Sequence, residues 1–234
     1  MRHALRAKHY SIRTEKAYVD WARRYILFHG KRHPRELGSD HVNRFLTHLA
    51  VERKVAASTQ NQALAGLLFL YGEVLKMPLP DTGGLVRAKK PRRIPTVLTR
   101  EEVYQVLSRL DGPQKIAATL LYGAGLRLLE VLRLRVKDVD FGLGQLVVRD
   151  GKGQKDRVTM LPDAVRGTLA LHISEVRRLH ARDLAEGFGN VWLPDALIRK
   201  FPDADNLWAW QWVFPAAARS RDPRSDREMR HHLH

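Results

Sequence analysis

The stretch Gly123-Ala124-Gly125-Leu126-Arg127-Leu128-Leu129-Glu130-Val131-Leu132-Arg133-Leu134 decides the fold of the second half of the chain. Its glycines predict a turn, and its leucines at helical spacing predict a helix from Leu126 to about Leu134. Arg127 opens that helix, and a guanidinium there offers a planar fork of donors that matches a phosphate. Glu130 lies on the same helical side. Glu130 could orient Arg127 for an anion, or the two could simply form an ion pair on the helix surface. This stretch alone favours neither interpretation.

A second box, Gly151-Lys152-Gly153-Gln154-Lys155-Asp156-Arg157, follows at the tip of a predicted hairpin. The β-prone runs 146–148 and 158–161 form its two strands. Flanking glycines let the tip approach another backbone closely, so Lys152 can place an ammonium beside a phosphate as a counter-charge or a general acid. Taken by itself, Lys152 is better explained as a solvated hairpin lysine, and Lys155 competes for the same role.

The charge balance points to a polyanionic partner. The 234 residues carry 41 Lys and Arg against 25 Asp and Glu, a formal net charge of +16, and no cysteine. The missing cysteines exclude a disulfide scaffold and a thiolate site, and no apolar run reaches the length of a membrane span. The amino terminus has no secretory pattern, so we expect a soluble, intracellular protein. Nucleic acid is the leading partner, and an ordinary basic protein of the ribosomal type is the alternative.

The chain contains no motif for metal or nucleotide chemistry. Asp138 and Asp140 have no companion acidic motif, and no phosphate-binding P-loop is present. The histidines near the C-terminus give a weak zinc signal without cysteine partners. We therefore expect no cofactor and no metal, with cationic side chains stabilising any developing charge.

The first 84 residues read as a helical unit. Tyr18, Trp21, Tyr25 and Phe28 recur at helical spacing, and we expect them to be core rather than a base-stacking surface. Ser39 is predicted to cap a second helix that turns Val42, Phe45, Leu46 and Leu49 inward. A capping box of Thr59 and Gln62 is predicted to start a third helix, with an apolar face of Leu64, Leu67, Leu68, Tyr71 and Leu75.

A basic interdomain linker is predicted at residues 85–98, and a second domain at 99–234. The linker carries Lys89, Lys90, Arg92 and Arg93, which either lie along a phosphate backbone or are simply solvated. A capping box of Thr99 and Glu102 is predicted to start a helix with Val103, Val106, Leu107 and Leu110 on one face. Further helices are expected at 116–122 and 163–184. The predicted fold class is mainly α with a small β-hairpin or sheet in the second domain (α+β).

Taken in this order, the elements resemble the tyrosine recombinases. The boxes around Arg127 and Lys152 carry the resemblance, which covers essentially the whole chain. The run from Val191 to Pro215, with its Trp-Ala-Trp-Gln-Trp core, looks like the additional segment of the integron integrases, here about 187–218. The Arg230-His231-His232 ending and the stretch 10–15 fit that subgroup too.

The resemblance implies a helical core-binding, SAM-like domain at 1–84 and a partial catalytic domain that together clamp DNA. In that family a tyrosine attacks the phosphate and forms a 3′-phosphotyrosine without metal or cofactor. Arg127 would hold the non-bridging oxygens, Lys152 would protonate the leaving oxygen, and Glu130 would support them. Trp210, Pro223, His231 and His232 would hold bases protruding from folded single-stranded sites. Further DNA contacts are expected from a larger set: Gln60, Asn61, Lys89, Lys90, Arg92, Arg93 and Lys155.

The sequence also departs from the family pattern. Its six tyrosines all precede Arg127, and it has no His-x-Leu-Arg box. We therefore expect a truncated integron integrase that binds DNA in the bacterial cytoplasm, at the nucleoid, without cleaving it. Two alternatives stay open. Function could be restored in trans by self-association or by a full-length recombinase, or the chain could be a non-enzymatic basic DNA- or RNA-binding protein. We further expect the second domain to fold only marginally.

Overall fold

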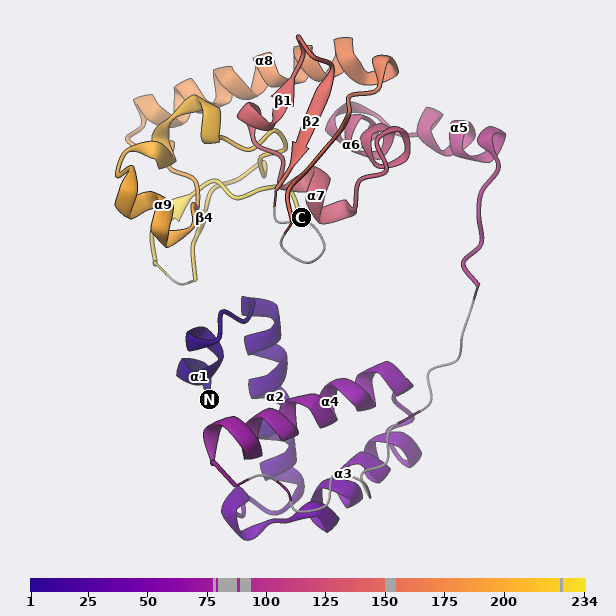
Figure 1. The fold of residues 1–234 in the computed structure, drawn as a ribbon, viewed down its shortest axis with the longest axis vertical. Coiled ribbons are helices and arrows are strands. Elements are labelled where there is room, and N and C mark those ends of the chain that lie inside the picture. The colour runs from indigo at the N-terminus through magenta and orange to yellow at the C-terminus, as the bar shows by residue number, and fades with distance from the viewer. Residues whose placement is uncertain (78, 80–87, 89–93, 150–154, 224) are drawn as a thin grey trace. The chain divides into compact units, whose positions relative to one another are not determined.

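The computed structural model describes residues 1–77, 79, 88, 94–149, 155–223 and 225–234. It divides into two compact units, Met1–Pro95 and Thr96–His234 (Figure 1). The boundary falls inside the predicted linker, most of which lies outside the described residues. Helices predominate and the strands are short, as expected from the sequence.

The N-terminal unit is a helical bundle. Its elements are α1 (Arg2–Ala7), α2 (Ile12–Phe28), the 3₁₀ turn η1 (Pro34–Glu36), α3 (Ser39–Val51), α4 (Ala57–Phe69) and the π-helical turn η2 (Leu70–Val74). Helix α4 packs against both α2 and α3. Of the four aromatic residues expected in the core, Trp21 and Tyr25 are buried there, beside Phe45 and Tyr71. The prediction is wrong for Phe28, which is 40% exposed at the end of α2, and Tyr18 is only partly buried. The expected inward face of α3 is also buried.

Two predicted helix starts are wrong by a few residues. The N-cap of α3 is Gly38, whose N–H donates to His41 Nδ1 at 3.2 Å, so Ser39 is the first helical residue. Helix α4 begins at Ala57, so Thr59 and Gln62 already lie inside it. Gln62 instead accepts a hydrogen bond from the Trp21 indole, at 3.3 Å. A tertiary contact therefore takes the side chain that local spacing assigns to a cap.

The second unit combines helices with two small antiparallel sheets. Its elements are α5 (Arg100–Ser108), α6 (Gly112–Gly123), α7 (Leu128–Leu132), η3 (Val136–Asp138), β1 (Val139–Asp140), β2 (Gln145–Val148), β3 (Arg157–Met160), α8 (Asp163–Ala185), α9 (Asp195–Lys200), η4 (Ala204–Asn206), η5 (Trp208–Trp210), β4 (Ser220–Arg221) and β5 (Glu228–Met229). The first sheet has the order β1-β2-β3, with Leu146 opposite Thr159. The predicted hairpin and the long helix α8 are confirmed.

The core of this unit lies between β2, α6 and α8. Leu146 and Val148 of β2 join Leu120 of α6 and Leu169 of α8 in one buried cluster, and Figure 1 shows α8 crossing behind the sheet. Gly123 at the end of α6 is tightly packed, since a Cβ there would lie 2.7 Å from Pro162 Cγ.

The helix predicted from Leu126 to Leu134 is shorter than expected. Helix α7 ends at Leu132 because the next residues pair with a distant segment. Leu134 accepts a hydrogen bond from Val213 N–H at 2.9 Å, and Val136 N–H donates to Gln211 at 3.0 Å. Backbone pairing with residues 211–213 thus replaces the last helical turn and attaches the tryptophan-rich segment to the domain.

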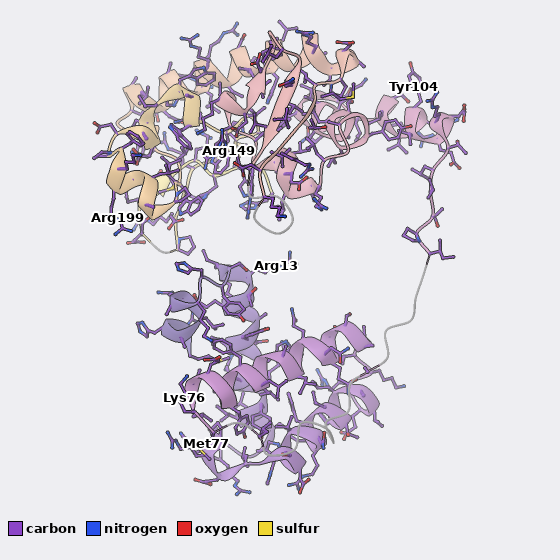
Figure 2. All side chains as sticks on the ribbon, in the orientation of Figure 1. Arg13, Lys76, Met77, Tyr104, Arg149 and Arg199 are labelled. Carbon is purple, nitrogen blue, oxygen red and sulfur yellow. The ribbon has the colours of Figure 1, made fainter. Side chains whose placement is uncertain are left out.

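Helix α5 does not bury the face that its periodicity predicts. Its capping box is confirmed, with Thr99 N–H donating to Glu102 at 2.8 Å and Glu102 N–H donating to Thr99 at 3.2 Å. No residue of α5 is buried, and Val106 is 51% exposed. Tyr104 extends from α5 away from the rest of its unit (Figure 2). Within the described residues, no helix is both long and apolar enough to cross a membrane.

Candidate nucleic-acid interface

Arg127 is held at the N-cap of α7 by the carboxylate of Glu130. Glu130 Oε2 accepts the backbone N–H of Arg127 at 2.9 Å, and Oε1 accepts from Nη1 at 2.7 Å. The Glu130 side chain is only 8% exposed, whereas that of Arg127 is 57% exposed. The carboxylate is therefore largely covered by its partners, and the guanidinium it holds faces solvent. The predicted pair exists, and it presents a cation.

A third residue, Arg157 on β3, completes this cluster. Its Nη1 donates to Glu130 Oε1 at 3.0 Å, and its Nη2 donates to Oε2 at 2.7 Å. Hydrogen bonds from Arg157, with smaller contributions from Arg127, lower the pKa of Glu130 to about 2. Glu130 is thus ionised at neutral pH, and two arginines against one carboxylate leave the cluster a net charge of +1.

The base of the hairpin is braced by a second ion-pair group. Arg149, just after β2 and labelled in Figure 2, donates from Nε to Asp138 Oδ1 at 2.7 Å. It also lies 3.7 Å from Asp156 on the opposite arm. Lys155 is exposed at the start of the returning arm. Lys152 lies outside the described residues.

The tryptophan-rich segment is attached to the domain by a buried arginine. Arg135 is 6% exposed, and its guanidinium carbon lies 3.1 Å from the centroid of the Trp212 ring. It donates to the carbonyls of Trp210 and Trp192 at 2.8 and 2.7 Å. Burial lowers the pKa of Arg135 to about 9. Arg135 thus fixes the backbone on either side of the segment and stacks on one of its rings.

Of the residues expected to hold protruding bases, Trp210 is partly exposed, with Lys137 Nζ lying 2.9 Å from its ring centroid. His232 packs edge-on against Trp212 with ring centroids 5.3 Å apart, and burial lowers its pKa. Pro223 is exposed in the turn between β4 and β5. His231 is mostly buried, and its Nε2 lacks a hydrogen-bond partner and lies 3.9 Å from Asp222.

In the N-terminal unit, Gln60 and Asn61 make contacts within the unit. Gln60 is 5% exposed and donates to the carbonyl of Leu46 at 3.3 Å. Asn61 forms two hydrogen bonds with the backbone of Ala88, accepting its N–H at 3.2 Å and donating to its carbonyl at 3.0 Å. Asn61 therefore holds one residue of the linker. Lys89, Lys90, Arg92 and Arg93 lie outside the described residues.

Metal ligation has no support among the residues that the structure describes. They contain no group of three or more His, Cys, Asp or Glu side chains that could hold a metal ion. The polar clusters of the second unit are instead arginine–carboxylate pairs, whose exposed members offer hydrogen-bond donors. Such surfaces recognise anions, and phosphate in particular.

Sequence reasoning did not assign a role to Arg157, Arg135 or Trp212. Arg157 stands in the quoted hairpin box, and a strand position there is a signal that it faces the same side as Thr159. Arg135 follows Arg133 in alternation with leucines, which hints at a non-helical stretch with one side chain buried. Neither pattern identifies the partner, because Glu130 and Trp212 are distant along the chain.

Comparison with known proteins gives the family. Residues 1–81 match the phage integrase N-terminal SAM-like domain, and residues 96–230 match the phage integrase family. Curated integrase/recombinases of Escherichia coli and Pseudomonas aeruginosa are 50% identical over 234 residues, covering 100% of this chain and 69% of each relative. The tyrosine recombinase XerA of Thermococcus kodakarensis is 36% identical over 186 residues, covering 74% of this chain and 61% of the relative. The chain therefore belongs to the phage integrase family of tyrosine recombinases.

Two solved recombinase structures match part of the chain at low identity. A crystal structure of XerA recombinase covers 74% of this chain and 61% of its own, with 23% identity and a TM-score of 0.33. A structure of XerH recombinase bound to a palindromic difH substrate covers 70% and 53%, with 16% identity and a TM-score of 0.46. The chain spans about two thirds of the length of the curated relatives it matches.

Proposed function

We propose that residues 1–234 are the DNA-binding and phosphate-contacting part of a site-specific recombinase of the integron-integrase type. The observation that carries this proposal is the cluster at α7, where a buried Glu130 holds an exposed Arg127 and is itself neutralised by Arg157. Membership of the family supports DNA as the partner. The net charge of +16 supports binding to the phosphate backbone of that DNA.

Arg127 binds a phosphate through the donors that Glu130 does not use. Within the described residues, Glu130 takes the backbone N–H and Nη1 of Arg127. A guanidinium carries five N–H donors, so Nε and Nη2 remain for two non-bridging oxygens. Because the acid is buried and the fork is fixed on one side, the arginine is preorganised for the anion. Lys155 adds a second cation from the hairpin.

On their own, these 234 residues bind the phosphate without cleaving it. Covalent strand cleavage needs a nucleophile, and the tyrosines of this sequence all precede Arg127. Tyr25 and Tyr71 are buried in the N-terminal core. Burial and the hydrogen bond with Tyr71 raise the pKa of Tyr25. A raised pKa makes the phenol harder to deprotonate, so Tyr25 is unsuited to act as a nucleophile. Strand exchange therefore needs a nucleophile from outside these 234 residues, and we place the reaction in the cytoplasm at the nucleoid.

The integron-type specificity rests on the segment that Arg135 attaches. Partly exposed Trp210 and His232, next to Trp212, offer ring faces and edges to bases that protrude from a folded single strand. His231 and Pro223 belong to the same C-terminal part of the unit. The contacts of Arg135 with the Trp192 and Trp210 carbonyls and with the Trp212 ring fix the position of this segment on the domain.

A comparative binding titration tests this proposal. The probes are a folded single-stranded hairpin with protruding bases and a plain duplex of equal length, at physiological salt. We expect tighter binding to the hairpin, with the preference lost in Trp210→Ala and His232→Ala but kept in the matched control Trp208→Ala. We also expect no covalent protein–DNA adduct after denaturation. Equal, salt-labile binding to both probes would contradict the integron-type proposal and favour a non-enzymatic basic nucleic-acid-binding protein.

A further inference from the structure

Arg157 and Arg127 contact the same carboxylate in different ways. Arg157 uses both terminal nitrogens on Glu130, at 3.0 and 2.7 Å, in a bidentate pair. The guanidinium of Arg127 meets Glu130 through Nη1, at 2.7 Å. The Arg157 side chain is 37% exposed, less than that of Arg127. The bidentate arginine is therefore committed to the acid, and the monodentate one keeps donors for a ligand.

The second arginine determines the net charge of the cluster. If Arg127 alone faced Glu130, the pair would be neutral and an approaching phosphate would meet the carboxylate as well as the guanidinium. Arg157 supplies the second positive charge, so the cluster keeps a net charge of +1 beside the exposed fork. A buried carboxylate also needs a strong partner, because leaving it unpaired is costly.

Strand β3 also aligns the cluster with the turn that precedes Arg127. Thr159, which lies on the same side of β3 as Arg157, donates to the carbonyl of Ala124 at 3.2 Å. The strand that returns from the hairpin tip is thus bonded at two successive same-face positions to the turn and helix that carry Arg127. The two sequence boxes meet through Arg157 and Glu130.

We infer that Arg157 is a positioning residue: it neutralises Glu130 and holds it against α7, so that Arg127 keeps an uncompensated, oriented positive charge for a DNA phosphate. This inference rests on the proposed function. It adds a residue that acts on the phosphate through Glu130 and that does not itself contact DNA.

Substitution and charge rescue test this role. In duplex titrations at fixed physiological salt, Arg157→Gln should weaken binding about tenfold, as far as Arg127→Ala does, because Glu130 then neutralises Arg127. The double variant Arg157→Gln/Glu130→Gln should restore most of the affinity, because it removes the acid that needs neutralising. Arg157→Lys should keep part of it. A matched control is Arg227→Gln, which removes an equal charge from another half-exposed arginine on a buried carboxylate, Asp205.

The outcomes separate this inference from the proposed function. Loss in Arg157→Gln with recovery in the double variant supports the inference. Loss without recovery overturns it, because Arg157 would then contact DNA itself or serve only the fold, which thermal melts of each variant would distinguish. An unchanged Arg157→Gln beside a weakened Arg127→Ala overturns the inference and leaves the proposed function standing. Unchanged affinity in both variants overturns the phosphate site and the inference together.

Discussion

Glu130 accepts hydrogen bonds from both Arg127 and Arg157, so the stability of the second unit should fall when acid protonates this carboxylate. Its folded pKa, about 2, lies below the ordinary value of 4.5. The stability it contributes is therefore fully present above about pH 4.5 and is lost as pH falls toward 2. Denaturant unfolding of wild type and Glu130→Gln should show a stability difference that shrinks across this window. A difference that stays constant from pH 6 to 2.5 would contradict the assignment.

A buried hydroxyl in the N-terminal core offers a second residue-level test. Tyr71 Oη lies 2.9 Å from Tyr25 Oη and 3.0 and 3.1 Å from the carbonyls of Pro34 and Leu37. Tyr71→Phe should lower the free energy of unfolding of this unit by about 1–3 kcal/mol, because it leaves buried polar groups unpaired.

Tyr104→Phe serves as the control for that measurement by calorimetry, since Tyr104 is 76% exposed. It should change stability by less than about 0.5 kcal/mol. Equal effects of the two substitutions would show that the Tyr71 hydroxyl is not satisfied as the structure has it.

The contact between Arg127 and Glu130 could be predicted from the sequence, because residues three apart lie on the same side of a helix. Arg157 could not be assigned to Glu130, because the contact crosses from a strand to a helix 27 residues away. The burial of Gln60 and the backbone partners of Gln60 and Asn61 could not be predicted either, because they depend on how other segments pack around α4.

At the level of elements, the C-terminal hairpin is attached to α8 mainly through the carboxylate of Asp183, with a further contact from Arg219 to Glu186 at the end of the helix. Asp183 accepts from Arg230 Nε at 2.6 Å and Nη2 at 2.7 Å, and from Arg219 Nη1 at 3.2 Å. Its side chain is almost fully buried. Asp183→Asn should destabilise the second unit by about 3–5 kcal/mol, because the mostly buried Arg230 loses its charge partner, whereas Arg219 keeps Glu186 and Glu228.

Chemical denaturation of that unit measures the effect. Asp226→Asn, which weakens an exposed pair with Arg221 in the same hairpin, should cost less than about 1 kcal/mol. If both variants unfolded at the same denaturant concentration as wild type, the hairpin would not depend on Asp183 for its attachment.

Local signals predicted which elements exist, and distant contacts decided where they end. Alternation and length sufficed for β2, β3 and α8. The end of α7 depends on residues 211–213, and no property of Leu134 announces that pairing. The apolar spacing of α5 correctly predicts a helix, yet periodicity cannot tell whether another element covers its face. Strand β1 has two residues and carries no periodic signal at all.

At the scale of the whole molecule, two separate cores predict two unfolding steps. One cluster of buried residues belongs to Met1–Pro95 and the other to Thr96–His234. The second unit carries the exposed apolar side of α5, so we expect it to unfold first. Calorimetry should resolve two transitions, with Tyr71→Phe shifting the later one and Asp183→Asn the earlier one. One cooperative transition that both substitutions shift would contradict this division.

The proposed contact between Arg127 and a DNA phosphate should show itself in the salt dependence of duplex binding. Wild type and Arg127→Gln would be titrated with the same duplex from low to physiological salt, and the logarithm of the association constant plotted against that of salt concentration. Each phosphate contact contributes a slope of about −0.9. We predict a slope for Arg127→Gln that is shallower by about one. An identical slope would show that the exposed guanidinium held by Glu130 does not meet a phosphate.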